Sequence, residues 1–421
     1  MNKICIKGPS KLIGDIKISG SKNSVLPILI LSLFLDGEVI IKNVPNIFDV
    51  NIVIKLLIYI GSKIEYSNST YYINNKFINT SSIPYEFASK IRASIWIIAP
   101  LLYRFNCVNT FFPGGCSIGL RPIDLHIYAL KKLGVLFELN NNIISAKING
   151  SFFGSIINLN KISVGATITS ISAAILAEGT TIIKNSSKEP EVIDVINFLN
   201  MLGANIIGAG TNEIKVIGKK KLNNIGKSYY IPFDRIETGT FLIAAAISRG
   251  NITCENVKFD RLKIVLNKLK NTGASINVGN DFINLNMNSK RPKSVSLYTF
   301  PYPGFPTDMQ PQFSILNSIG TGSSYIIENI FENRFTHVNE LISMGANIII
   351  KNNKIIFYGV NNLFGSIIEA KDLRSSISLV LAGSIAIGET IINNINYINR
   401  GYENIFSKLK SIGLNFKLFF D

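Results

Sequence analysis

The chain has 421 residues, of which 47% are hydrophobic and 17% are charged, and its formal net charge is +16. This length allows two or three domains with large cores, and the composition excludes a disordered chain. The longest apolar run, residues 25–35, is too short to span a bilayer, and residues 1–18 lack the pattern of a secretory signal. We therefore expect a cytoplasmic protein that has no membrane partner.

The positive charge raises the question of nucleic acid as a partner. The lysines are scattered, with Lys219–Lys221 as the longest cluster, and no basic stripe is interleaved with aromatic residues. Because nucleic-acid-binding proteins concentrate charge on one face, this distribution argues against DNA or RNA. A basic cleft would still attract a small anionic substrate.

An apolar helix end, a glycine and a strand recur along the chain in that order. The six copies are 68 to 73 residues apart, at Gly61, Gly134, Gly203, Gly273, Gly345 and Gly413. We expect each glycine to end a helix in the left-handed conformation. A second pattern, a glycine followed by a β-rich strand and an asparagine, begins at Gly37, Gly179, Gly250, Gly322 and Gly388.

A third pattern precedes the second: a strand, then a short polar segment of one to three residues that we call a polar tip, then an apolar helix. The tips are Lys22–Asn23, Arg92, Ser163–Gly165, Asp234–Arg235, Asp308 and Asp372–Arg374. They are predicted to begin helices, whose free N–H groups bind anions. Together the patterns predict an α/β protein of six βαβαββ repeats, three in each of two domains, with boundaries near Ser21 and Ile231.

The segment FPGGCSIGLRPIDLH, residues 112–126, interrupts the second repeat. Cys116 follows a Pro-Gly-Gly turn and precedes Arg121, and Pro122 occupies a position typical of the first residue of a helix. These surroundings are typical of an activated thiol, although a buried structural cysteine remains an alternative. The other cysteines lie in strand-like segments and are predicted to occupy core positions, namely Cys5, Cys107 and Cys254.

No phosphate-binding P-loop, dinucleotide fingerprint, zinc-protease motif or serine-hydrolase motif is present in the sequence. The cysteines form no CxxC, and His126 and His337 are far apart, so we expect no metal site. The remaining chemistry lies in cations and acids at or near the tips: Lys22, Arg92, Arg121, Arg374, Arg400, Asp308 and Asp372. For Asp308 alone, a helix N-cap is the structural alternative.

Several of these segments resemble one family. They are GSKNS, KIRASIW, FPGGCSIGLRPIDLH, KISVGAT, EPEVIDV, DRIETGTF, FPTDMQ, FENRFTHV, DLRSSISLVLAG and NRGYE. The chain is similar to the UDP-N-acetylglucosamine enolpyruvyl transferases from residue 7 to about residue 416. The resemblance implies two inside-out α/β barrel domains, with the first strands belonging to the C-terminal domain. We therefore expect one domain at 22–231, with Cys116, and the other at 1–21 and 232–421, with Asp308.

The resemblance also implies a reaction. The enolpyruvyl group of phosphoenolpyruvate would pass to the 3′-hydroxyl of UDP-N-acetylglucosamine with release of phosphate, the step that opens peptidoglycan precursor synthesis. Cys116 matches the family's proton donor, which also forms an adduct with phosphoenolpyruvate and is alkylated by fosfomycin. Asp308 matches the base that activates the hydroxyl. No cofactor is implied, and we expect a monomer.

Substrate-binding residues are implied by the same motifs. Phosphoenolpyruvate would meet Lys22, Asn23, Arg121, Arg374 and Arg400, of which Lys22 and Arg400 also match catalytic positions. UDP-N-acetylglucosamine would meet Arg92, Arg121, Pro122, Ile123, Asp124, Leu125, Lys161, Ile162, Ser163, Val164, Gly165, Asp308 and Ile330. For Glu189, Glu191 and Arg334, substrate contact and a structural role such as capping or a salt bridge both remain open. His126 is expected to be a structural hydrogen-bonding residue.

Two other functions remain as alternatives. A synthase of the enolpyruvylshikimate phosphate type would share the fold and mechanism but lacks the FPGGC thiol loop. A noncatalytic anion- or RNA-binding repeat protein would explain the charge, but not the combination of thiol, carboxylate and cations.

Overall fold

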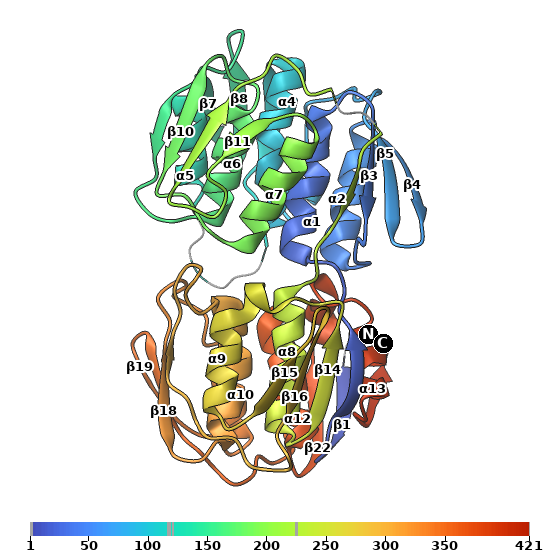
Figure 1. Ribbon diagram of the computed structural model, residues 1–421, viewed down its shortest axis with the longest axis vertical. Helices are drawn as coiled ribbons and strands as arrows, with labels where there is room; N and C mark the ends of the chain where they lie inside the picture. Colours follow the sequence, from blue (N-terminus) through green and yellow to red (C-terminus); the bar gives the residue numbers. More distant parts are fainter. Residues whose placement is uncertain (1–2, 116–118, 120–121, 224–225, 421) are drawn as a thin grey trace. The chain divides into compact units, whose positions relative to one another are not determined.

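The computed structural model describes residues 3–115, 119, 122–223 and 226–420 (Figure 1). Its contacts divide the chain into two compact units. We call residues 20–115 and 122–232 the first unit, and residues 3–19 and 233–420 the second unit. Both are α/β, and Figure 1 shows in each unit sheets on the flanks with helices between them.

The first unit contains three sheets. Two have four strands, in the orders β13-β3-β5-β4 and β11-β12-β10-β9, and one has three strands in the order β6-β8-β7. The strands of these sheets are β3 (Glu38–Lys42), β4 (Lys63–Ser67), β5 (Thr70–Asn74), β6 (Cys107–Phe111), β7 (Val135–Asn140), β8 (Ile143–Ile148), β9 (Ile156–Asn158), β10 (Thr180–Lys184), β11 (Asn205–Ile207), β12 (Glu213–Ile217) and β13 (Ser228–Tyr230).

The second unit contains three four-stranded sheets, in the orders β21-β22-β1-β23, β15-β16-β14-β2 and β17-β18-β20-β19. Their strands are β1 (Lys3–Gly8), β2 (Ile13–Lys17), β14 (Asn251–Glu255), β15 (Ser275–Val278), β16 (Phe282–Asn286), β17 (Leu297–Tyr298), β18 (Ser323–Ile327), β19 (Asn347–Lys351), β20 (Lys354–Tyr358), β21 (Ile367–Glu369), β22 (Gly388–Asn393) and β23 (Phe416–Phe419). The first two strands of the chain therefore pair with strands of its C-terminal half, since β1 lies between β22 and β23 and β2 lies beside β14.

The four-stranded sheets share one pattern of strand directions. In each, one edge strand is parallel to its neighbour and the other two pairings are antiparallel, as for β9, β10, β12 and β11. One face of the longer strands is buried, and the alternation of residues such as Ile252 and Cys254 in β14 reflects this. Cys254 is fully buried as predicted, but Cys5 and Cys107 are only partly buried, so the prediction of core positions was wrong for them.

Helices fill the space inside the sheets. Those of the first unit are α1 (Lys22–Leu31), η1 (Ser32–Phe34), α2 (Phe48–Tyr59), α3 (Tyr85–Ala88), η2 (Arg92–Ile97), α4 (Ile98–Phe105), α5 (Asp124–Lys132), α6 (Val164–Ala174) and α7 (Pro190–Met201). Those of the second unit are α8 (Arg235–Ile247), η3 (Phe259–Leu262), α9 (Lys263–Asn271), η4 (Thr307–Met309), α10 (Gln310–Ile319), α11 (Val338–Ser343), α12 (Leu373–Ile385), η5 (Ile395–Arg400) and α13 (Ile405–Ser411).

Three helices of the second unit are buried nearly all round. Every residue of α8 and α10 is buried, and so is almost all of α12. A helix in such surroundings has no polar face, which explains sequences such as TFLIAAAI. The hydroxyl groups that do occur there donate to carbonyls one turn earlier, as Thr240 does to Ile236 at 2.7 Å. Among the described helices, none has the length and apolarity that crossing a membrane requires.

The helix boundaries follow the predicted patterns. The six glycines at the predicted helix ends have φ between +91° and +110°, a left-handed conformation that glycine adopts without strain. All six predicted polar tips begin helices, which confirms that prediction. The helices at Arg92 and Asp308 start as 3₁₀ turns, η2 and η4, before they continue as α4 and α10.

Candidate active site

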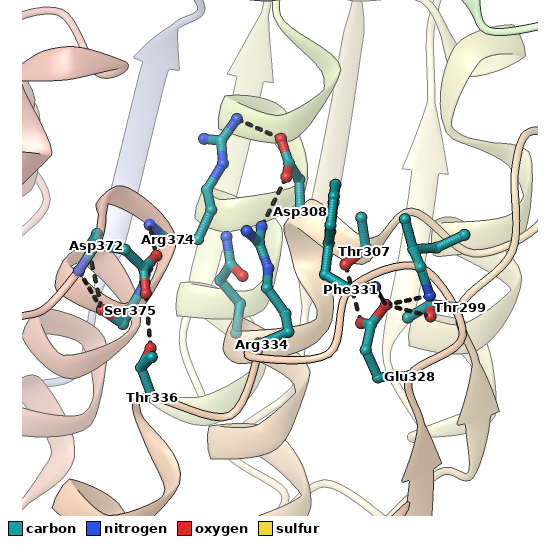
Figure 2. A network of polar contacts seen from close by, with 12 residues as sticks. Thr299, Thr307, Asp308, Glu328, Phe331, Arg334, Thr336, Asp372, Arg374 and Ser375 are labelled. Atoms are coloured by element: carbon teal, nitrogen blue, oxygen red, sulfur yellow. Dashed lines mark hydrogen bonds and ion pairs between the residues drawn. The ribbon is translucent and has the colours of Figure 1, made fainter. Parts of the chain in front are cut away.

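The carboxylate of Asp308 is held between two buried arginines of the second unit (Figure 2). Arg334 donates from Nη2 to Oδ1 at 2.7 Å, and Arg374 donates from Nη2 to Oδ2 at 2.9 Å. The arginine side chains are 3% and 4% exposed, whereas that of Asp308 is 28% exposed. The N-caps of η4 and α10 are Pro306 and Met309, so the capping alternative for Asp308 is wrong.

Arg374 is a permanent cation despite its burial. Burial by itself lowers the pKa of Arg374, but the Asp308 carboxylate more than offsets this, and the net pKa lies above the ordinary value. A buried guanidinium that lost its carboxylate would be strongly destabilising, so the pair holds both side chains in place. For Arg334, the salt bridge to Asp308 supports the structural alternative.

Asp372 fixes the start of the helix that carries Arg374. It is the N-cap of α12, accepts from the backbone N–H groups of Arg374 and Ser375 at 2.9 and 3.1 Å, and completes a capping box with Ser375. Its other oxygen accepts from the Thr336 hydroxyl at 2.6 Å. Burial acts to raise the pKa of Asp372, but the charge of Arg334 and these hydrogen bonds outweigh burial and lower it. Asp372 therefore remains an anion that orients α12.

Glu328 is a buried acid that the sequence did not point to. Its carboxylate accepts from the hydroxyls of Thr299 and Thr307 at 2.8 and 2.9 Å, and from the backbone N–H groups of Ile330 and Phe331 (Figure 2). It thereby ties the residue before Asp308 to the half-buried Ile330. The only sequence signal was its place directly before Asn329 in the second recurring pattern, and this position is lysine, glutamate or asparagine in the other copies.

In the first unit, Lys22 and Asn23 begin α1 as predicted. Ser21 caps the helix by accepting from Ser24 N at 3.3 Å. Lys22 Nζ lies 2.8 Å from Oδ2 of Asp49, in the first turn of α2, and the two side chains are 11% and 5% exposed. A cation at a helix N-terminus is unfavourable, and Asp49 compensates for it. Nothing in the sequence singled out Asp49, because the pairing joins two different helices.

Arg92 connects the two flanks of the predicted thiol loop. Its guanidinium donates to the carbonyls of Pro113 and Pro122 at 3.4 and 3.0 Å. Position 114 in this loop must be glycine, because a Cβ atom there would lie 1.6 Å from the carbonyl oxygen of Ser89. Cys116 and Arg121 themselves lie outside the described residues.

Two groups of the residues predicted to bind the nucleotide sugar, 122–125 and 161–165, lie at the starts of α5 and α6. Ile123 is the N-cap of α5 and Ser163 caps α6, accepting from Ala166 N at 3.3 Å. His126 Nδ1 lies 2.8 Å from Thr169 Oγ1, a buried contact of the kind expected for a structural hydrogen-bonding residue. The side chains that remain exposed there are those of Pro122, Asp124, Lys161 and Ile162, while Val164 and Gly165 are half-buried and Leu125 is buried.

The remaining predicted residues are placed as follows. Arg400 ends η5 and is half-buried. Glu189 is the N-cap of α7 and accepts from the Ser187 hydroxyl, and Glu191 is buried in the same turn. Within the described ranges, no group of three acidic, histidine or cysteine side chains is arranged to hold a metal ion. The structure therefore brings Asp308 and Arg374 together in one unit, and places Lys22, Arg92 and the α5 and α6 starts in the other.

Comparison with known proteins gives consistent matches over the whole chain. The family described as EPSP synthase (3-phosphoshikimate 1-carboxyvinyltransferase) matches residues 6–409. A UDP-N-acetylglucosamine 1-carboxyvinyltransferase of Wigglesworthia glossinidia brevipalpis is 54% identical over 417 residues, 99% of each chain. One of Buchnera aphidicola subsp. Schizaphis graminum is 53% identical over 99% of this chain and 100% of its own. The crystal structure of the enolpyruvyl transferase NikO from Streptomyces tendae superimposes with a TM-score of 0.90 at 21% identity, covering 99% of both chains.

Proposed function

The chain belongs to the enolpyruvyl transferase family of EPSP synthase, and from that premise we propose that it transfers the enolpyruvyl group of phosphoenolpyruvate to UDP-N-acetylglucosamine, in peptidoglycan precursor synthesis. This choice of acceptor rests on one observation: the chain is 54% identical, over 99% of its length, to an enzyme named for that reaction. Relatives of the shikimate type share the fold at 18% identity, with TM-scores of 0.78 and 0.79. The FPGGC segment supports the same choice.

We infer that the six sheets mark six βαβαββ repeats, three in each unit, in the inside-out barrel arrangement that the family resemblance implied. The common pattern of strand directions in the four-stranded sheets supports this. In the three-stranded sheet, a parallel bridge between Ser82 and Asn109 stands where the other sheets have a parallel edge strand. The enzyme would act in the cytoplasm as a monomer, with no nucleic acid or membrane as partner.

The proposed chemistry needs one base and one acid. Asp308 takes the proton of the 3′-hydroxyl while the sugar oxygen bonds to C2 of phosphoenolpyruvate, and the Cys116 thiol supplies a proton to the methylene carbon. A proton is then lost from the new methyl group and the phosphate leaves, which restores the double bond. The two arginines support this role because they hold both carboxylate oxygens of Asp308 in fixed positions by charge-assisted hydrogen bonds.

The proposed binding residues match the charges of the substrates. Phosphoenolpyruvate carries a phosphate and a carboxylate, and Lys22, Asn23, Arg121, Arg374 and Arg400 would bind them. The uridine diphosphate and sugar would contact Arg92, Pro122–Leu125, Lys161–Gly165, Asp308 and Ile330, with the free N–H groups at the start of α6 suited to phosphate oxygens. No cofactor is needed, because phosphoenolpyruvate itself carries the activated group.

A phosphate-release assay tests the proposal. The purified chain is mixed with phosphoenolpyruvate and either UDP-N-acetylglucosamine or shikimate 3-phosphate. We expect release with the nucleotide sugar alone, and a product heavier than the nucleotide sugar by one enolpyruvyl group in the mass spectrum. Release with shikimate 3-phosphate would favour the shikimate-type alternative, and salt-dependent RNA binding without release would favour the noncatalytic one.

A further inference from the structure

Glu328 lies directly after β18, and the sheet fixes its backbone. Its N–H donates to the carbonyl of Asn353 at 2.9 Å, and its carbonyl accepts from the Asn353 side chain at 3.3 Å. Asn353 stands between β19 and β20, and β20 pairs with the whole length of β18. Glu328 is 3% exposed, and it has no role in the chemistry proposed above. Its carboxylate is therefore a buried group on a rigid support.

Four hydrogen bonds converge on this carboxylate. Oε1 accepts from the hydroxyl of Thr299 at 2.8 Å and from the backbone N–H groups of Ile330 and Phe331 at 2.9 and 3.2 Å. Oε2 accepts from the hydroxyl of Thr307 at 2.9 Å. Every partner donates, which matches an ionised carboxylate, because such a group only accepts and has about four lone-pair sites. The two oxygens thus hold two different segments, residues 330–331 and Thr307.

The first connection from Glu328 to Asp308 runs through η4. Thr307 directly precedes Asp308, and both residues lie in this single turn. Pro306, the N-cap of η4, has no side-chain atom that could accept a hydrogen bond and cap the turn. The bond from the Thr307 hydroxyl to Oε2 therefore fixes the start of η4 to the end of β18.

The second connection runs through Phe331. The centroid of its ring lies 5.8 Å from the guanidinium carbon of Arg334, and this guanidinium holds Oδ1 of Asp308 at 2.7 Å. Figure 2 shows Thr307 and Phe331 between Glu328 and Asp308 in that view. Ile330, which is expected to contact the nucleotide sugar, is held by the same carboxylate oxygen as Phe331.

We propose that Glu328 is a positioning residue that fixes the base and the contact to the nucleotide sugar relative to each other. Oε2 holds the turn that carries Asp308, and Oε1 holds the backbone at Ile330. The proposal rests on the proposed function, in which Asp308 is the base. Glu328 is buried and acts through these residues. The effect on rate can be large, because a misplacement of about 1 Å at a reacting group can cost about 10²-fold.

Two substitutions separate the functions of the two oxygens. Thr307→Val replaces the hydroxyl by a methyl group and breaks only the bond to Oε2, whereas Thr307→Ser keeps that bond. Glu328→Gln keeps the shape, and its NH₂ group can still donate to Thr307, but one amide oxygen with two lone pairs then faces the three donors at Oε1. The matched control is Glu369→Gln, which alters an exposed glutamate at the end of β21 that accepts from Asn394 at 2.6 Å.

Steady-state phosphate release is measured for each variant with both substrates varied, after thermal unfolding confirms that each is folded. For Thr307→Val we expect kcat to fall by about tenfold while KM for the nucleotide sugar stays nearly constant, because the base alone is displaced. For Glu328→Gln we expect KM for the nucleotide sugar to rise by roughly threefold to tenfold, the effect of one lost hydrogen bond. Thr307→Ser and Glu369→Gln should match the unmodified chain. Equal kcat for Thr307→Val and Thr307→Ser, or equal KM for Glu328→Gln and Glu369→Gln, would overturn the proposal.

Crystal structures of the two variants separate this proposal from the proposed function. In Thr307→Val we expect η4 to have turned, so that Asp308 lies beyond hydrogen-bond distance of Arg334 or Arg374. In Glu328→Gln we expect the backbone at residues 330–331 to have moved away from the amide oxygen. An unmoved Asp308 and an unmoved backbone would overturn the positioning role, whatever the enzyme's substrate. Conversely, absence of phosphate release from the unmodified chain would refute the proposed function and leave the positional claim to the crystal structures.

Discussion

A carboxylate shared by two guanidiniums cannot be replaced by its amide. Asparagine has the shape of aspartate, but its NH₂ group would face either Arg334 or Arg374, and both of these are donors only. For Asp308→Asn we expect kcat for phosphate release to fall by about 10²–10⁴-fold, the usual contribution of a general base. Asp36→Asn, which alters an exposed acid 4.0 Å from Arg104, is the control. Comparable activity in both variants would remove Asp308 from the role of base.

The cysteines should differ in reactivity. Burial and the charge of Glu237 raise the pKa of Cys254 far above its ordinary value, and burial is the main cause that raises the pKa of Cys5. Because the thiolate is the nucleophile, both should react slowly. We expect fosfomycin to modify Cys116, as located by mass spectrometry of tryptic peptides, and Cys116→Ala to lose phosphate release with an unchanged melting temperature. Label found only on Cys107 or Cys254 would contradict the assignment.

His337 should limit stability in acid. It is fully buried, and both ring nitrogens lack a hydrogen-bond partner among the described residues. Burial lowers its pKa to about 3 from the ordinary 6.5. The unfolded chain therefore takes up this proton first, so stability present above pH 6.5 is lost as the pH falls toward 3. We expect His337→Gln to reduce the pH slope of the unfolding free energy in this window by about 1.4 kcal/mol per unit, measured by urea titration. Equal pH slopes of the unfolding free energy for the unmodified chain and His337→Gln would contradict the prediction.

At the scale of elements, two helix caps of different completeness can be compared. Asp372 accepts two backbone bonds at the start of α12, and its own backbone N–H donates to the Ser375 hydroxyl, whereas Ser163 accepts one bond at the start of α6. Loss of a cap costs about 0.5–2 kcal/mol of stability. We expect Asp372→Ala to lower the unfolding free energy by the upper end of this range or more, because it also leaves the Thr336 hydroxyl without its acceptor. We expect Ser163→Ala to lower it by an amount near the lower end. Urea unfolding measures both, and equal costs would contradict the comparison.

Element boundaries were predictable because they depend on local chemistry. Gly61 and its five counterparts end helices because glycine adopts the left-handed conformation, and Asp372 begins α12 through side-chain bonds to Arg374 and Ser375. Contacts between elements were not predictable in this way. Asp49 meets Lys22, and Arg334 meets Asp308, only because separate helices and turns pack together. The contacts of Glu328 have the same origin, and this residue has no distinctive sequence signal.

At the scale of the whole molecule, two of the places where the chain passes between the units lie next to Ser19 and next to Phe233. The two passages are joined by backbone bonds, from Asp234 N to Ser19 O at 2.9 Å and from Ser21 N to Pro232 O at 2.7 Å. Glu237 anchors Ser19 by accepting its backbone N–H at 3.0 Å, and Lys408 reaches both Glu237 and the Ser19 hydroxyl. The buried contacts of Glu237 and Lys408 thus link Ser19, α8 and α13 at the point where the chain crosses.

This anchor should give stability a dependence on pH near neutrality. Burial raises the pKa of Glu237 to about 7, although Lys408 acts against it. The folded chain then binds this proton more tightly than the unfolded chain, so the contribution is complete below the ordinary pKa of 4.5 and is lost as the pH rises through 7. Relative to Glu237→Gln, we expect the unfolding free energy to fall by about 1.4 kcal/mol per unit across this window. Parallel curves of unfolding free energy against pH for the unmodified chain and Glu237→Gln would refute this prediction.

The position of β1 between β22 and β23 has a consequence for synthesis on the ribosome. The first strand to emerge has no partner until the last strands have been translated, which takes about 20–80 s at ordinary elongation rates. During that time KICIKG, with its apolar side chains, remains available to chaperones or to wrong partners. The unit that contains Asp308 therefore cannot close before β23 (Phe416–Phe419) has been translated, whereas the strands and helices of the other unit are complete soon after residue 232 has emerged.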